Sequence, residues 1–533
     1  MQKNLSRVWG ILLGFSVLTA CQKDAPYVSP DQTTEFHKNE WYKSNFEFYA
    51  LTDANQLIRY SGGRKIEKKQ TITLTGLATG EMIKAIDFRP ATGQLYGVST
   101  ANKIYTINQY NGVVYAIGVA FTPALNSSNI GMDFNPTVDR IRLVTDAGQN
   151  LRANPETGAI VATDGNLNPG TPMVGAVAYT NNFAGTTTTT LYDIDAATDK
   201  LYMQNPPNNG TLALVGSLGV DVKGEAGFDI NSNNTIALAV LETVGDDDKD
   251  DDEKDGDVDE DSYGKDYPKT KRYFYSINLS TGKATKIAKA ERNIIGLAIP
   301  TDMVAYGVDE MNQLLIFNPM NPGTMITKAI TVPMGEKIVG IDFRPATAQL
   351  YAVSSASKIY ALNLSSGAAT LVGTGFAASL TASNYAMDFN PTVDRIRLIG
   401  DNGQNLRLNP ITGALAATDA NLNPGMPKVD AVAYTNNIPG ATTTTLYDID
   451  YGTDSLYIQN PPNNGTLVGV GSLGVKIDGG NGFDIGSTSG KAYAVLNTGS
   501  RSGIYQINLM TGRASKIADL SKKFGSFTIG LGF

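Results

Sequence analysis

A repeat at two levels constrains the fold of this chain more than any other feature of its sequence. The run from Met132 to Leu143 recurs without a change from Met387 to Leu398. Inside each half, a short apolar run recurs every 44 to 51 residues, a period typical of repeat architectures. One spacing in the first half is 69 residues because it contains a 25-residue insertion. The fourth position of this run falls at 87, 133, 178, 229 and 298, and then at 342, 388, 433, 484 and 532.

Each of these ten units contains four short runs with the composition of strands. In the unit that starts at Ile86, three further runs follow, at 94–99, 103–108 and 113–117. Asn111-Gly112 precedes the last run, and glycine supplies the positive φ that a hairpin turn requires. No long helical periodicity occurs after residue 45. The pattern predicts an all-β protein, a β-propeller of ten four-stranded blades in two homologous five-blade halves, 46–300 and 301–533.

The number of rings depends on how the two halves join. The folded part opens at Phe46–Leu51, which matches a second strand, and ends at Ile529–Phe533, which matches a first strand. We therefore expect the C-terminal strand to complete the opening blade. Only Pro300 to Met303 would connect two separate rings, a span of roughly 17 Å at about 3.5 Å per residue. This favours a single ten-blade ring, and two five-bladed propellers are the alternative.

Three motifs connect the body to a known family. They are FRPATGQLY from Phe88 to Tyr96, DFNPTVDRIR from Asp133 to Arg142, and YDID from Tyr192 to Asp195 with the following QNPPNNG. These motifs resemble a bacterial family of secreted proteins known only as domain of unknown function 4394, present here as two copies. The resemblance covers nearly all of 46–533 and implies no activity, substrate or catalytic residue.

The start of the chain has the pattern of an export signal. Lys3 and Arg7 precede an apolar run, Val8 to Leu18, that is too short to span a bilayer as a helix. The next residues, Leu-Thr-Ala before Cys21, resemble a bacterial lipobox, in which the cysteine receives lipid. We expect residues 1–20 to be a lipoprotein signal peptide and Cys21 to be the lipidation site.

Residues 21–45 are polar and mixed, and we interpret them as a tether. Gln22-Lys23-Asp24 is similar to the export tag of surface lipoproteins of the Bacteroidota, although Ala25 replaces its second acid. The expected location is the bacterial cell envelope, with a lipid anchor in the outer membrane and the body exposed at the surface.

The scarcity of histidine and cysteine excludes several chemistries. His37 and Cys21 are the only residues of their types, and both precede the repeats. The repeated body therefore has no Cys/His zinc cluster and no histidine base for a catalytic triad. The net charge of −8 argues against nucleic acid as a partner.

A series of aspartates supplies the only catalytic candidates. They fall on the predicted innermost strands: Asp87, Asp133, Asp229, Asp342, Asp388 and Asp484. Carboxylates around an axis could cleave a glycosidic bond. However, Ile86 and Phe88 flank Asp87, so alternation along the strand points its side chain towards a neighbouring blade or loop. A buried aspartate that accepts hydrogen bonds from turn amides is the interpretation we favour.

Two other repeated groups fit structural roles. Arg140 and Arg142 share one strand face near Asp133 and Asp139, which favours an Asp–Arg network between blades over an anion site. The threonine runs 186–190 and 442–445, with the Asn-Pro-Pro-Asn-Asn-Gly loops, have the chemistry of strands and turns.

An acidic insertion at 246–266 interrupts the first half. Part of it approximates a calcium-binding loop, with the candidate ligands Asp251, Glu253, Asp255, Asp257 and Asp259. Ser262 stands where such loops carry a bidentate glutamate, which favours a solvated acidic loop. Calcium at this insertion is the one cofactor the sequence suggests.

These observations favour an exported, lipid-anchored binding or scaffold module for a protein or glycan ligand. A carbohydrate-active enzyme that uses the axial aspartates and a calcium-binding surface protein are the alternatives. Whether the chain is an enzyme stays open, and binding is the expected role.

Overall fold

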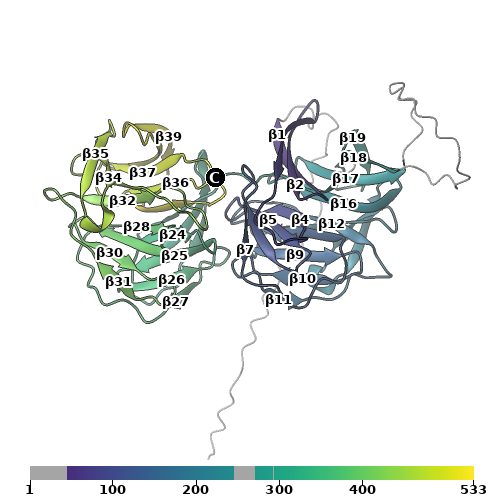
Figure 1. Cartoon of the computed structure of the whole chain (residues 1–533), viewed down its shortest axis with the longest axis horizontal. Helices are drawn as coiled ribbons and strands as arrows, with labels where there is room; N and C mark the ends of the chain where they lie inside the picture. Colours follow the sequence, from purple (N-terminus) through teal and green to yellow (C-terminus); the bar gives the residue numbers. More distant parts are fainter. Residues whose placement is uncertain (1–44, 245–269, 292) are drawn as a thin grey trace, which may run out of the picture.

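The computed structural model describes residues 45–244, 270–291 and 293–533. In this part of the chain, forty strands form ten antiparallel sheets of four strands each (Figure 1). The predicted ten four-stranded blades are confirmed. None of the described helices has the length and apolar character to cross a membrane.

The first half forms five blades. Their strands are β20 (Ile294–Ala298), β1 (Phe46–Thr52), β2 (Gln56–Gly62) and β3 (Glu67–Thr73); β4 (Ile83–Phe88), β5 (Leu95–Ser99), β6 (Ile104–Ile107) and β7 (Val114–Ile117); β8 (Ile130–Asn135), β9 (Arg140–Thr145), β10 (Asn150–Ala153) and β11 (Ile160–Thr163); β12 (Val174–Tyr179), β13 (Leu191–Asp195), β14 (Lys200–Gln204) and β15 (Leu212–Ser217); β16 (Val222–Ile230), β17 (Ala237–Val244), β18 (Thr270–Ile277) and β19 (Ala284–Lys289). A short 3-10 helix, η2 (Pro207–Asn209), follows β14.

The second half forms five more blades in the same way. Their strands are β40 (Ser526–Ile529), β21 (Ala305–Val308), β22 (Gln313–Asn318) and β23 (Asn321–Ala329); β24 (Ile338–Arg344), β25 (Gln349–Ser354), β26 (Lys358–Leu362) and β27 (Ala369–Val372); β28 (Tyr385–Asn390), β29 (Arg395–Gly400), β30 (Asn405–Leu408) and β31 (Leu415–Thr418); β32 (Val429–Tyr434), β33 (Leu446–Asp450), β34 (Ser455–Gln459) and β35 (Leu467–Ser472); β36 (Gly482–Ile485), β37 (Ala492–Thr498), β38 (Arg501–Ile507) and β39 (Ala514–Leu520). The helix η3 (Pro462–Asn464) corresponds to η2.

The expectation of a single ten-blade ring is wrong, because each half closes on itself. β20 pairs with β1, so the last strand of the first half completes that half's opening blade. β40 pairs with β21 in the same way in the second half. The C-terminal strand therefore closes only the second ring, and the protein consists of two five-bladed propellers, seen as two separate lobes in Figure 1.

The position of the last strand also differs from the expectation. β40 is Ser526–Ile529, which begins three residues and ends four residues before the predicted first strand at Ile529–Phe533. Phe527 and Ile529 pack into a buried cluster with Phe317 and Val495, and this burial fixes the register. The residues Gly-Leu-Gly-Phe that follow Ile529 match the sequence pattern of a first strand, but they lie beyond β40. Among them, the amide of Gly532 donates a hydrogen bond to Thr92 O of the first ring at 2.8 Å.

A short connector suffices because the rings pack face to face. We call the side with the connections from first to second and from third to fourth strands the turn face. The turn faces contact each other: Tyr306 Oη donates to Ala91 O at 2.7 Å, and Arg89 Nη1 donates to Ala348 O at 3.1 Å. The chain crosses at this contact between β20 and β21. The opposite sides, which we call the mouth faces, consequently lie at the two ends of the molecule (Figure 1).

The core lies between adjacent blades. A tyrosine on the second strand of one blade packs against the phenylalanine that follows the aspartate position in the next blade. The Tyr96–Phe134 and Tyr351–Phe389 pairs show this contact in each ring, with ring centroids 5.2 and 5.4 Å apart. Such edge-to-face pairs contribute about 0.5–1.5 kcal/mol beyond their buried area. The repeated motifs are therefore the contacts that join blade to blade.

Candidate functional site

Each ring brings three of the predicted aspartates together near its axis. In the first ring these are Asp87, Asp133 and Asp229, and in the second Asp342, Asp388 and Asp484. One carboxylate oxygen from each residue lies within 4.8 Å of those of the other two. We call these groups the first and second triads. Every triad member is at most 3% exposed.

Strand alternation predicted the environment of these side chains only in part. Asp87 accepts hydrogen bonds from the amide of Phe88 at 2.7 Å and from Phe134 of the next blade at 2.8 Å. Asp229 likewise accepts from Ile230 at 2.6 Å and from Ile299 at 2.5 Å. The aspartates are buried and bonded to amides as expected, but those amides belong to strands and their immediate ends. The bonds from Phe134 and Ile299 join one blade to the next, whereas those from Phe88 and Ile230 lie within a strand.

Asp133 has no such hydrogen bonds. Both of its carboxylate oxygens are buried without a hydrogen-bond partner among the described residues. The amide of Tyr179 lies near enough to lower its pKa in part, but not at hydrogen-bonding geometry. In the second triad, Oδ1 of Asp388 is also buried and unpartnered. A buried acceptor without a partner is rare in folded proteins and costs about 1–3 kcal/mol or more.

The second triad has an additional hydroxyl group. Oγ1 of Thr528 lies 2.9 Å from Oδ1 of Asp342 and 2.8 Å from Oδ2 of Asp484. The corresponding residue in the first ring is Ala298, since Thr528 pairs with Tyr306 as Ala298 pairs with Tyr49. A hydroxyl has one hydrogen and can donate to only one of these oxygens at a time.

Burial and crowding make the triads poor acids. Burial raises the pKa of Asp87 and Asp133 well above its usual range, and neighbouring triad carboxylates raise it further. Burial raises the pKa of Asp229 to about 7 and that of Asp484 to about 6. Asp342 and Asp388 have strongly raised pKa values for the same two reasons. Three negative charges cannot share such a site without compensation.

This geometry does not support glycoside cleavage by the axial aspartates. The first strands of all five blades enclose only narrow spaces beside the triads, about 20 Å³ in the first ring and about 10 Å³ in the second. Such volumes accommodate about one water molecule. A glycosidase needs two carboxylates on either side of a bound sugar. No sugar can reach these carboxylates in this conformation.

The arginines form the predicted networks between blades, with partners that the sequence did not identify. Arg142 donates to Asp164 at 2.6 Å, to Asn150 at 2.7 Å and to Asn208 of the next blade at 2.8 Å. Arg397 repeats these contacts in the second ring with Asp419, Asn405 and Asn463. Asp139 pairs with Arg89 instead of Arg142.

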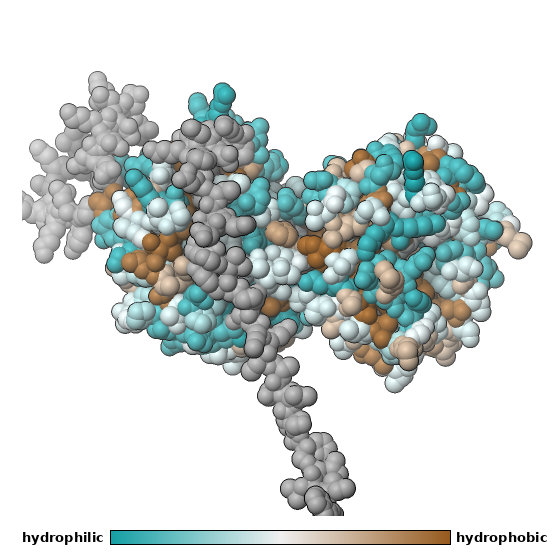
Figure 2. Space-filling model, turned by 180° about the vertical axis from the view of Figure 1, so that it is seen from behind, coloured by the Kyte–Doolittle hydropathy of each residue, from teal (hydrophilic) through white to brown (hydrophobic). Residues whose placement is uncertain are grey.

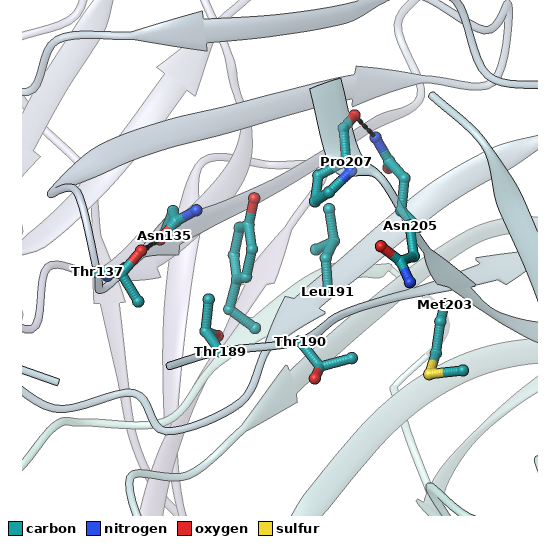
Figure 3. Close-up of a pocket in the computed structure, with 10 residues that line it drawn as sticks. Asn135, Thr137, Thr189, Thr190, Leu191, Met203, Asn205 and Pro207 are labelled. Atoms are coloured by element: carbon teal, nitrogen blue, oxygen red, sulfur yellow. Dashed lines mark hydrogen bonds between the residues drawn. The ribbon is translucent and has the colours of Figure 1, made fainter. Parts of the chain in front are cut away.

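The threonine and Asn-Pro-Pro loops line a small cavity on the turn face of the first ring (Figure 3). Its volume is about 60 Å³, and Tyr179, Thr189 and Asn205 are among its lining residues. Tyr179 Oη accepts from Arg142 Nε at 3.3 Å. This space is large enough for very few water molecules, and the surrounding loops have the structural role expected of them.

The sequence did not predict an opening at the axis of the second ring. At the mouth face of the second ring, a cavity of about 560 Å³ lies where the blades begin. We call it the second mouth. Four blades contribute to its lining, which includes Asp309, Glu310, Asn312, Lys337, Ser383, Asn384, Tyr385, Asn481, Asn497 and Lys523. Tyr385, Asn481, Gly525 and Ser526 also line the narrow space beside the second triad, so the mouth leads along the axis towards it.

A buried acid supports the floor of the second mouth. Asp430 accepts hydrogen bonds from the amides of Gly480 at 2.5 Å and Asn481 at 3.2 Å. Burial raises the pKa of Asp430 to about 7 despite these bonds. In the first copy, Gly175 and Ala226 stand at the positions of Asp430 and Asn481. Comparing the two copies residue by residue is the signal that could have located this site.

Several predicted residues cannot be placed. Cys21, His37 and the acidic-loop candidates Asp251, Glu253, Asp255, Asp257 and Asp259 lie outside the described residues. Lipidation and calcium binding at those positions stay predictions.

Fold and site together define a duplicated five-bladed β-propeller with a sealed carboxylate triad in each ring. The model of the family described as domain of unknown function (DUF4394) matches residues 56–298 and 313–529, one match for each ring. The chain belongs to this family, in two copies. No curated protein matches it.

Among solved structures, a Dos1 propeller is similar over 67% of this chain and 90% of its own, with 10% identity and a TM-score of 0.25. The propeller domain of Cps50 (Swd1) from Myceliophteria thermophila is similar over 73% of this chain and 99% of its own, with 10% identity and a TM-score of 0.24.

Proposed function

We propose that the protein is an exported binding module whose ligand site is the second mouth. The observation that carries this proposal is the open cavity of about 560 Å³, lined by polar groups from four blades. Small-molecule sites are typically concave, between about 300 and 1,000 Å³, and contain a few convergent polar groups. The end of a propeller axis lets several blades contribute such groups to one ligand.

The lining favours a neutral, hydroxyl-rich ligand, such as a terminal segment of a glycan. Two acids, Asp309 and Glu310, are offset by two bases, Lys337 and Lys523. Asn384 adds a half-buried amide group, which can both donate and accept hydrogen bonds, while the buried amides of Asn481 and Asn497 are bonded within the protein. An anionic or cationic ligand would be better served by a lining of one sign.

The sequence supports a place for this module in the cell envelope. The export signal in residues 1–20 and the lipobox-like run before Cys21 would attach it to the outer membrane through lipid. Residues 21–45 would then hold the rings away from the membrane surface. Most of the side shown in Figure 2 carries hydrophilic or neutral residues, with apolar ones in small separate groups.

Blocking the second mouth tests the proposal. Residues 45–533 contain every strand of both rings, so this fragment can be screened against immobilised bacterial envelope polysaccharides and oligosaccharides. Ser383 is an exposed lining residue, and Ser383→Trp should fill the opening and reduce retention at least tenfold. Ser128→Trp places the same bulk at the matching position of the first ring and should leave retention unchanged.

Two outcomes would contradict the proposal. One is that no glycan is retained by the wild-type fragment. The other is that S383W and S128W affect retention equally, which would place the ligand elsewhere on the rings.

A further inference from the structure

We propose that each triad is a binding site for one divalent cation, and that calcium is the cation that fits. The first site would consist of Asp87, Asp133 and Asp229, and the second of Asp342, Asp388 and Asp484. These residues are distinct from the lining of the second mouth and from the acidic insertion. The inference does not depend on the proposed function.

The distances match the size of a calcium ion. Three oxygens that lie no more than 4.8 Å apart have a common centre no more than about 2.8 Å from each of them. Calcium–oxygen bonds measure about 2.3–2.6 Å, so a contraction of a few tenths of an ångström completes the contact. Magnesium needs about 2.0–2.1 Å and near-ideal octahedral geometry, which would demand a larger rearrangement.

Asp133 is the second, independent observation. Its carboxylate belongs to the first triad, is 1% exposed and has no hydrogen-bond partner at either oxygen. Asp87 and Asp229 are each held by two amides, so their orientation is fixed without a ligand. The fold thus presents two oriented carboxylates and one free carboxylate around one point. A cation at that point would satisfy the oxygens that the protein leaves unpaired.

The distribution of the aspartates among the blades also favours a cation site over aspartates that only join neighbouring blades. If the aspartates served only to join neighbouring blades, all five blades could use one. Instead, Ala178 and Ala298 occupy the position in the other two blades of the first ring, and Ala433 and Thr528 do so in the second. The same three of five blades carry the acid in both rings. Small residues at the remaining two positions leave room beside the carboxylates.

The surroundings supply further oxygen ligands. A space of about 20 Å³ at the axis of the first ring, lined by the residues that precede the triad members in the sequence, can hold a water molecule. In the second ring, the hydroxyl of Thr528 already touches two of the three carboxylates. Calcium takes six to eight oxygen ligands, and second carboxylate oxygens, water and this hydroxyl can provide the remainder.

The test is the calcium content of purified protein after exhaustive dialysis against calcium-free buffer, together with thermal unfolding with calcium and with chelator. We expect two calcium ions per chain and a lower unfolding midpoint in chelator. Asp133→Asn should remove one ion, Asp388→Asn the other, and the double variant both. Deleting residues 246–262 should leave two ions, which separates the triads from the acidic insertion.

Asp193→Asn is the matched control. Asp193 is also a buried aspartate with two unpartnered oxygens, but it lies outside both triads, so this variant should keep two ions. Circular dichroism of each variant shows whether it is folded, and Asp87→Asn provides a second route to the first site.

The proposal is overturned if the folded wild-type protein binds no calcium and its unfolding midpoint is unchanged by chelator. That result would mean that protons shared among the carboxylates, and not a cation, offset the charge of each triad. D133N would then be as stable as the wild-type protein or more stable. It is equally overturned if calcium disappears only when residues 246–262 are deleted.

Discussion

The two rings contain the same arginine–aspartate pair in two different environments. Arg89 of the first ring is fully buried, and besides Asp139 it contacts Ala348 O across the ring contact. Arg344, at the same position of the second copy, pairs with Asp394 at the edge of the contact, where the acid's side chain is 32% exposed. The same residue pair is therefore buried to different extents, because the two copies are placed asymmetrically at their common interface.

The mouth faces of the two rings, by contrast, differ because their residues differ. The second ring has Asp430 and Asn481 where the first has Gly175 and Ala226. After a duplication, one copy can keep a simple structural role while the other changes its loops. The tyrosine–phenylalanine and arginine contacts between blades recur in both rings, and the differences lie at the mouths, at the ring contact and at Thr528.

The largest effect should follow from removing the arginine at the ring contact. Arg89→Ala would leave Asp139 and Glu156 without their buried cation, and breaking a buried ion pair typically costs about 3–5 kcal/mol. Arg344→Ala removes a partly exposed pair and should cost about 1 kcal/mol or less. Chemical denaturation of the two variants measures the difference. Equal losses would show that the deeper burial of Arg89 at the ring contact adds nothing to its contribution to stability.

The second prediction uses the acid that only the second ring possesses. Because the pKa of Asp430 is raised to about 7 in the folded protein, the folded state holds a proton there that the unfolded state loses near pH 4. The contribution of this residue to stability therefore falls as pH rises from about 4 through about 7, by up to about 4 kcal/mol.

Asp430→Asn cannot ionise, so its stability should depend less steeply on pH between 5 and 8. The unfolding midpoint as a function of pH measures this. Other acids of the protein also titrate in this range, so the slope should decrease without vanishing, and the exposed acid Asp53 gives the control Asp53→Asn. An unchanged slope in D430N would show that Asp430 is already ionised in the folded protein.

The third prediction concerns a glycine that the ring contact requires. Gly93 has a φ of +71°, and a Cβ atom there would lie 2.1 Å from the ring of Phe533. Gly93→Ala should cost about 1–3 kcal/mol through this overlap and the backbone strain. In the second ring the same position is Ala348, with a φ of 53°, so Ala348→Gly should change stability by less than about 1 kcal/mol.

Combining Gly93→Ala with Phe533→Ala separates the two causes in the same denaturation experiment. Truncating the ring should recover the steric part of the loss. If the double variant is as unstable as the sum of the single ones, the overlap is not the cause.

The blades were predictable because their signals are local. Strand-like runs, turn glycines such as Gly112 and a fixed period specify four-stranded units without knowledge of the whole. Ring closure was not predictable, since it depends on which distant strand completes the blade opened by β1. The short connector from Pro300 to Met303 favoured one ring, because its span is short for leaving one ring axis and entering another. The observed face-to-face contact removes that constraint.

The candidate site was predictable as a set of residues but not as a geometry. Alternation around Asp87 indicated which side of the strand the carboxylate takes, and that was correct. It could not indicate that three such side chains converge, because the distance between blades near the axis is a property of the closed ring. The second mouth was missed because its residues come from separate segments in four blades. Several of them differ between the copies: Lys337, Tyr385 and Asn497 stand where the first copy has Met82, Ile130 and Glu242.

The smallest predicted effect tests the difference between the triads. Thr528→Ala gives the second ring the arrangement of the first, where Ala298 stands at this position. The variant loses one buried hydroxyl that contacts two carboxylates, which should cost about 1–2 kcal/mol. Thr528→Ser keeps the hydroxyl and should retain most of the stability, as measured by thermal unfolding. If T528A and T528S are equally destabilised, the loss comes from the methyl group's packing, and the two triads are equivalent in their polar contacts.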